Sequence, residues 1–151
     1  MVKLGFFFTG YLSVILAIFL LLSFTSNGWI VYGLFLLPCY GLALIVGWLR
    51  LLKHRHQTAR FKHGVWLTIM ALQMGVVLTS PGNCYMAKQG ASCYSNLQIF
   101  FGNVPRLGAT TVPHWTTAEH AFYGLLIAYA IALALGLWTT SFHTEHDGEE
   151  P

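Results

Sequence analysis

The chain alternates long apolar runs with short polar segments. Four runs are long enough to cross a bilayer as helices, which takes roughly 20 mostly apolar residues. They cover residues 4–24, 29–49, 61–80 and 118–139. Away from their ends, these runs contain no Asp, Glu, Lys or Arg. The pattern predicts an all-α membrane protein with four transmembrane helices in an antiparallel bundle, formed by residues 1–142.

Local signals refine this bundle. The first run is longer than the 7 to 15 residues of a signal-peptide core and has no small-residue cleavage pattern after it, which indicates a retained span. Residues 26–28 read Ser-Asn-Gly, which predicts a tight turn and a hairpin between the first two spans. Pro38 lies near the middle of the second span and predicts a kink there, because proline lacks a backbone donor.

Composition excludes an ordinary soluble domain. Of the 151 residues, 56% are hydrophobic and 9% charged, whereas soluble domains carry about 25% charged residues. Charged groups inside spans usually mark ion or proton paths, so their absence argues against a pump or transporter. The sequence offers no catalytic residue, and we expect a protein that is not an enzyme.

Basic residues set the expected orientation, because cytoplasmic loops are enriched in Lys and Arg. Five of the eight lie between the second span and the first residues of the third: Arg50, Lys53, Arg55, Arg60 and Lys62. This predicts that both termini are cytoplasmic, in a bacterial plasma membrane or a thylakoid, with residues 143–151 as an acidic cytoplasmic tail. The net charge of +3 then reflects this loop, and we expect no nucleic-acid partner.

The loop over residues 81–115 is predicted to face outward, where an oxidising compartment favours disulfides. Cys84 and Cys93 are expected to form a bridge there, whereas a thiol-exchange enzyme would usually show a C-x-x-C pair that this chain lacks. Cys39 is expected to be a small buried residue. Residues 96–107 are apolar but too short to cross, so they are predicted to cap the bundle or to contact a partner protein.

The start of the fourth span contains several polar side chains that could bind a ligand or cap a helix. Thr116 and Glu119 fit the S/T-x-x-E capping box, which predicts a helix start. His120 follows near the positive end of the helix dipole, which disfavours the imidazolium. A neutral imidazole is the form that ligates metals.

A stripe of small residues at four-residue spacing runs from His120 through Gly124, Ala128, Ala132 and Gly136. Such a stripe allows another helix backbone, or a flat cofactor, to approach closely. Two interpretations remain open. One is a helix-packing groove with a hydrogen-bonded histidine at its mouth, and the other is ligation of haem iron, chlorophyll magnesium or another metal by His120.

A haem held by two histidines needs both at one membrane depth. His63 opens the third span and His120 the fourth, so about 20 residues of helix separate them by about 30 Å. At the outer side, His120 can pair with His114, or with Met74 or Gln73 of the third span. At the inner side, a pair such as His63 and His143 can hold a haem, although a solvated face is the alternative for these histidines. The inner histidines are His54, His56, His63, His143 and His146.

The stretches "RFKHGVWLTIMALQMGVVL" and "VPHWTTAEHAFYGLLIAYAIALALGLW" resemble a cyanobacterial four-span membrane family of unknown function, distantly similar to di-haem b-type membrane cytochromes. The resemblance lies in His63 before Gly64, and in His114 and His120 before Gly124. It implies a helical bundle that carries b-type haem for transmembrane or quinone-linked electron transfer. The chain departs from the cytochrome pattern in the first two spans, whose cores contain no histidine.

These observations lead to two functional hypotheses. The first is an accessory subunit of a larger photosynthetic or respiratory membrane complex, with one haem or pigment held through His120 and with lipid and other membrane subunits as partners. The alternative is a b-type cytochrome-like electron-transfer protein. The scarcity of ligands inside the spans favours the first.

Overall fold

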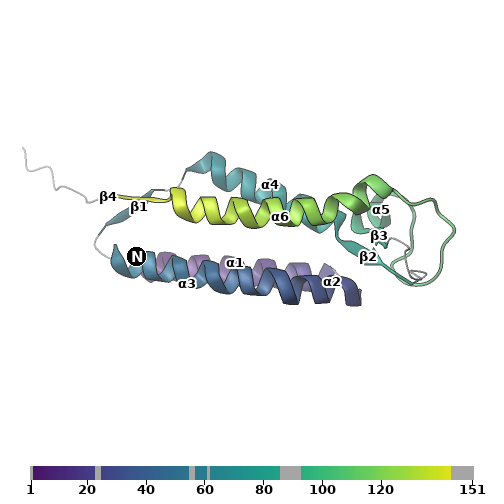
Figure 1. Ribbon diagram of the computed structural model, residues 1–151, viewed down its shortest axis with the longest axis horizontal. Helices are drawn as coiled ribbons and strands as arrows, with labels where there is room; N and C mark the ends of the chain where they lie inside the picture. Colours follow the sequence, from purple (N-terminus) through teal and green to yellow (C-terminus); the bar gives the residue numbers. More distant parts are fainter. Residues whose placement is uncertain (1, 23–24, 55–56, 61, 86–92, 144–151) are drawn as a thin grey trace, which may run out of the picture.

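The computed structural model describes residues 2–22, 25–54, 57–60, 62–85 and 93–143. Its elements, in chain order, are α1 (Val2–Leu22), α2 (Ser26–Val31), the π-helix η1 (Tyr32–Leu36), α3 (Leu37–Lys53), β1 (Thr58–Arg60), α4 (His63–Thr79), β2 (Pro81–Asn83), β3 (Tyr94–Ser95), α5 (Asn96–Phe101), α6 (Thr116–Thr139) and β4 (Ser141–His143). Figure 1 shows the long helices in two pairs, α1 with α3 and α4 with α6. α2, η1 and α3 form one continuous helical segment. The successive long helices α1, α3, α4 and α6 run in opposite directions, as the sequence predicts for a bundle.

Three of the described helical segments are long and apolar enough to cross a membrane: Gly5–Leu22, Gly28–Lys53 and Thr116–Thr139. The remaining long helix, α4, has 17 residues and is therefore about 26 Å long at 1.5 Å per residue. A bilayer core is about 30 Å thick. The chain is thus a mostly helical protein compatible with a membrane, and the fourth crossing stays a prediction.

Two short strand pairs, which the sequence did not predict, close the ends of this mostly helical bundle. At one end, β1 pairs antiparallel with β4, with Thr58 opposite His143. We call it the basic end, because α3 finishes there with Arg50 and Lys53 in its last turn. At the other, β2 pairs antiparallel with β3 beside the cysteine bridge, and we call it the disulfide end. Figure 1 shows the two strand pairs at opposite ends of the molecule.

His143, the first residue of the predicted acidic tail, belongs to β4 and lies opposite Thr58 of β1. Residues 144–151 lie outside the described part of the chain. Arg50, Lys53 and Lys62 lie at the end opposite the cysteine pair, and which end faces the cytoplasm stays a prediction.

The predicted turn over residues 26–28 is a helix start instead. The Thr25 hydroxyl accepts a hydrogen bond from the Gly28 amide at 3.2 Å, which is the bond a side chain at the N-cap position makes. Ser26-Asn27-Gly28 therefore forms the first turn of α2. The preceding residues, 23 and 24, lie outside the described part of the chain.

Pro38 is accommodated by a widened turn. Over Tyr32–Leu36 the backbone is a π-helix, and the Leu37 amide bonds to the Tyr32 carbonyl five residues back. The extra residue in this turn absorbs part of the mismatch caused by proline, which cannot donate to the ladder. It also keeps Tyr32, Leu36 and Tyr40, spaced by four, on the buried face.

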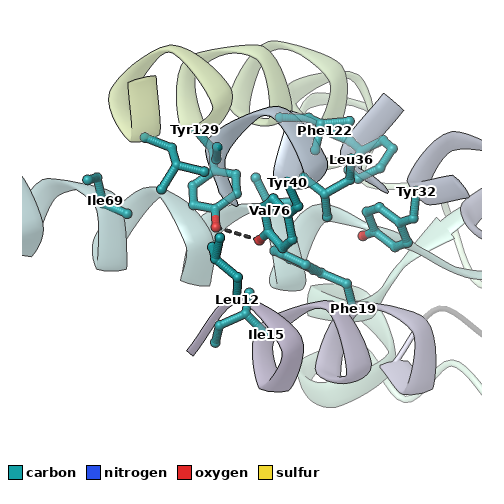
Figure 2. Packing of buried hydrophobic residues seen from close by; sticks show 13 residues of the cluster. Leu12, Ile15, Phe19, Tyr32, Leu36, Tyr40, Ile69, Val76, Phe122 and Tyr129 are labelled. Atoms are coloured by element: carbon teal, nitrogen blue, oxygen red, sulfur yellow. Dashed lines mark hydrogen bonds between the residues drawn. The ribbon is translucent and has the colours of Figure 1, made fainter. Parts of the chain in front are cut away.

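The core is a layer of aromatic and aliphatic side chains from all four long helices (Figure 2). Phe19 of α1 lies against Tyr32 and Tyr129, with ring centroids 5.2 and 6.1 Å away. The Tyr40 and Tyr129 hydroxyls are hydrogen-bonded at 2.5 Å, so the only polar atoms of these two buried rings satisfy each other. This bond connects α3 to α6 across the core.

The core face of α6 follows a heptad pattern. Besides Glu119, the buried residues of α6 are Phe122, Leu126, Tyr129, Leu133 and Gly136, which are separated by steps of four and three. At 3.6 residues per turn, this alternation keeps all five side chains within about 40° of one face. Gly136 lies close against α4, because a Cβ placed there would lie 2.6 Å from Cδ1 of Ile69 in that helix.

Candidate functional site

The disulfide end contains most of the candidate residues. A covalent bridge joins the two segments that form it. Cys84 and Cys93 form a disulfide with Cα atoms 4.5 Å apart, which confirms the predicted bridge. The strand pair brings the two cysteines together, because Asn83 lies opposite Tyr94 in the ladder. Cys39 is half-buried and free.

Helix α5 covers this end, and the side-chain amide of Asn96 holds it in place. The Asn96 side-chain nitrogen donates to the Leu22 carbonyl at 3.3 Å, to the Val77 carbonyl at 3.0 Å and to the Ser80 hydroxyl at 2.7 Å. It therefore binds α5 to the ends of α1 and α4 at once. The cap predicted for residues 96–107 is present, with α5 as its helical part and with Phe100 and Phe101 exposed on its outer side.

The side-chain amide of Gln98 holds the segment directly before α6. Gln98 is fully buried. Its Oε1 accepts from the Trp115 amide at 3.1 Å, and its Nε2 donates to the Pro113 carbonyl. These two bonds hold the segment that carries His114. Sequence reasoning missed both Asn96 and Gln98, although two amide side chains in the apolar stretch "NLQIFF" were the available signal.

His114 is the most firmly oriented histidine of this end. Its Nδ1 lies 2.8 Å from Oε1 of Glu119, and its ring stacks on Tyr94 with centroids 3.8 Å apart and planes at 13°. Glu119 is 8% exposed, and its Oε2 has no hydrogen-bond partner among the described residues. A histidine that ligates a metal through one nitrogen commonly donates its other N–H to a carboxylate. Here Nε2 would be the ligating atom.

The predicted capping box is therefore wrong. The cap residue of α6 is Trp115, which offers no side-chain oxygen, and Thr116 already lies inside the helix. The Glu119 amide bonds to the Trp115 carbonyl as in any first turn. The Glu119 carboxylate is thus free to hold His114 instead of reaching back to a threonine amide.

His120 lies one residue beyond Glu119 and is exposed on the outer side of α6. Its two proposed partners in α4 are placed differently. Met74 is 62% exposed, whereas Gln73 accepts a hydrogen bond from the Tyr11 hydroxyl at 2.7 Å. Ligation by any of these residues stays a prediction.

The histidines of the basic end are spread over separate elements. His63 opens α4, is exposed, and lines a cavity between the helices. His143 lies opposite Thr58 in the strand pair, and its side chain lies outside the described part. His54 Nδ1 is 2.8 Å from Gln57 Oε1, and His56 and His146 lie outside the described residues. Over the described ranges, no three His, Cys, Asp or Glu side chains form a metal-binding group.

The small-residue stripe does not form one straight groove. Positions four apart differ by about 40° around a helix, so the four steps from His120 to Gly136 turn by about 160°. Gly136 is consequently buried against α4, whereas Gly124 is exposed and a Cβ there would meet nothing within 4 Å. Between them, Ala128 is half-buried, and Ala132 packs against the core.

The exposed side of α6 has a heptad pattern of its own. Its members are His120, Gly124, Ile127, Ile131, Ala134 and Trp138, all exposed. We call this set the open face of α6. It lies nearly opposite the core face, because His120 and Phe122 differ by about 200° around the helix.

The arrangement can therefore offer two things: a helix face suited to another helix, and an imidazole at His114 held by a buried carboxylate. Comparisons with protein-family models, with curated proteins and with solved structures found no match to this chain, so the resemblance to membrane cytochromes stays a prediction.

Proposed function

We propose that this protein is an accessory subunit of a larger membrane complex and that the open face of α6 binds a transmembrane helix of a partner subunit. The observation that carries the proposal is the second heptad pattern on α6, with Gly124 in open space. Heptad spacing presents side chains in line to a neighbouring helix. Small residues at such a face let two backbones approach closely in lipid.

The polar end of this face supports the same interpretation. His120 is exposed at the first turns of α6, where the helix emerges at the disulfide end. In hydrocarbon, helices gain from packing and from hydrogen bonds between side chains, since lipid is as apolar as the helix faces themselves. An imidazole beside a glycine therefore supplies a donor or an acceptor at the point of closest approach.

The association prediction compares two glycines in equal surroundings. Gly124→Leu places a bulky side chain on the open face, whereas Gly10→Leu makes the same change on α1, where a Cβ also meets nothing within 4 Å. We expect Gly124→Leu to reduce the fraction of the chain in a larger assembly about tenfold, because the partner backbone is pushed away. Native gels of mildly solubilised membranes from the producing organism measure this fraction.

Gly10→Leu should leave the assembly unchanged, and neither variant should unfold more readily in detergent than the unmodified chain. Equal loss of assembly in the two variants, or none in either, would show that the open face of α6 faces only lipid.

A haem or pigment held at the disulfide end is the second candidate, and the His114–Glu119 pair is the observation that favours it. The pair fits a ligand role for His114 through Nε2, while Glu119 would fix the imidazole orientation. His120 would serve as a ligand at the open face, as the sequence suggests. Bound iron would supply one-electron chemistry, whereas a chlorophyll would supply light absorption.

The visible spectrum of the protein, purified in mild detergent from its native membrane, tests this candidate. We expect an absorption band that His114→Ala removes, that Glu119→Gln shifts or weakens, and that His120→Ala removes if His120 is a second ligand. A band that shifts on dithionite reduction would indicate haem and support the electron-transfer alternative. A colourless preparation that still assembles with partners would reject the cofactor and leave the subunit role standing.

A further inference from the structure

A cavity of about 400 Å³ lies at the basic end of the bundle, within the size range of small-molecule sites. Its walls come from α1, α3, α4 and α6. It exists because the helices approach unevenly there. A Cβ at Gly47 of α3 would lie 3.0 Å from Phe8 of α1, so the backbones of these two helices come close together. By contrast, α1 and α4 contact each other through long side chains such as Tyr11 and Trp66.

The walls of this cavity are apolar and aromatic. Phe7, Phe8 and Tyr11 line it from α1, and Trp66 and Met70 line it from α4. The Trp66 ring stands edge-on to Phe8 and to Tyr11, with centroids 6.5 Å apart in each pair. From His63 to Met70 the cavity follows two turns of α4, or about 10 Å. It therefore extends from the end of the bundle toward its middle.

The polar lining residues lie together at the helix ends. Arg50 is in the last turn of α3, His63 opens α4, and Thr140 follows α6. Arg50 donates hydrogen bonds to the Leu137 and Trp138 carbonyls, which fixes its positive charge beside the cavity. We call the part of the cavity lined by Arg50, His63 and Thr140 its mouth. The mouth is thus cationic, and the rest of the cavity is apolar.

Charge at this end favours an anion. Lys53 follows Arg50 by three residues in sequence, and Lys62 directly precedes His63. Glu119, the single acid among the described residues, lies at the opposite end of the molecule. The chain's own acidic tail is a poor occupant of the interior, because "TEHDGEEP" contains no long apolar side chain. A carboxylate or phosphate pairs well with arginine, and an acyl chain suits an aromatic cavity.

We propose that this cavity binds an anionic amphiphile, with the acyl chain between α1 and α4 and the carboxylate or phosphate against Arg50 and His63. The shared chemistry can come from a bilayer phospholipid or from a free fatty acid. This site does not depend on the subunit role, since it lies at the other end of the molecule from His120 and Gly124.

Native mass spectrometry of the delipidated full chain tests the proposal with three probes: oleate, dioleoyl phosphatidylglycerol and dioleoyl phosphatidylcholine. We expect one bound molecule of an anionic probe per chain, retained at least tenfold more than the zwitterionic lipid. Retention of oleate alone identifies a fatty-acid site, and retention of phosphatidylglycerol identifies a phospholipid site. Equal retention of all three probes overturns the proposal.

Matched variants locate the site. Met70→Trp places a larger side chain in the cavity wall and should lower retention at least tenfold. Leu67→Trp, at a similarly exposed α4 position outside the cavity lining, should not. Arg50→Gln should remove the preference for anions, whereas Lys53→Gln should keep it. Because Arg50 also bonds to α6, His63→Gln provides a second test of the mouth. Unchanged retention in both Met70→Trp and His63→Gln overturns the proposed site.

Discussion

Replacing Gln98 by leucine is expected to destabilise the disulfide end by about 2 to 4 kcal/mol. The substitution keeps the size of the side chain but removes both amide bonds, which leaves the Trp115 N–H and the Pro113 carbonyl without their partner. A partly buried polar group that loses its partner costs about 1 to 3 kcal/mol. Both groups lie directly before α6, so the start of that helix should loosen. Equilibrium unfolding in mild detergent measures the loss.

Hydrogen exchange distinguishes this local effect from general unfolding. The amides of Ala118 and Glu119, which bond to the Trp115 carbonyl, should exchange faster in Gln98→Leu, while amides near Leu133 should exchange as before. Phe101→Leu is the control, because it changes an exposed residue of the same short helix. Unfolding of Gln98→Leu at the same denaturant concentration as the unmodified chain would contradict the role given to this amide.

The long helices could be predicted from the sequence because their cause is local. Uninterrupted apolar runs and uncharged interiors give helix ends within about four residues of those observed. The Cys84–Cys93 bridge was predictable for a similar reason, since two nearby cysteines in one short loop have few other partners. Composition and short-range spacing carry this information without any knowledge of tertiary contacts.

The contacts that fix the disulfide end could not be predicted this way. Asn96 reaches the carbonyl of Leu22, 74 residues away, and no local pattern encodes such a pairing. Glu119 shows the same limit, because its spacing from Thr116 fits a cap while its carboxylate bonds to His114. Local sequence patterns indicate which neighbouring groups a side chain can bond to. Tertiary packing decides which bond forms.

The stripe of small residues on α6 does not lie on one face of the helix, and the reason is geometric. A spacing of four residues turns slowly around a helix, so it joins Gly124 on one side to Gly136 on the other. The alternating steps of four and three through Phe122, Leu126 and Tyr129 stay on one face and mark the true core. Heptad spacing is a property of the sequence alone, and it separates these two faces of the helix.

The same geometry predicts opposite results for two identical substitutions in one helix. Gly136→Leu is expected to destabilise the protein by about 1 to 3 kcal/mol, the usual cost of overpacking a core. A Cβ there lies 2.6 Å from Ile69, with Val65 and Trp66 close behind, so a leucine must push α4 away from α6. Gly124→Leu should leave the free energy of unfolding unchanged or slightly raise it, because its surroundings are open.

Replacing a helical glycine by leucine gains somewhat less than the roughly 0.8 to 1.0 kcal/mol of helix propensity that separates glycine from alanine, and this gain is the same at either position. The difference between the two variants in detergent therefore reports packing alone. Gly136→Ala should lie between them, since the terminal methyl of Ile69 can rotate away from a single added carbon. If Gly136→Leu were as stable as Gly124→Leu, α4 and α6 would not be packed at Ile69, and the heptad assignment of the core face would be wrong. The open face of α6, which is defined as its opposite, would then lose its basis too.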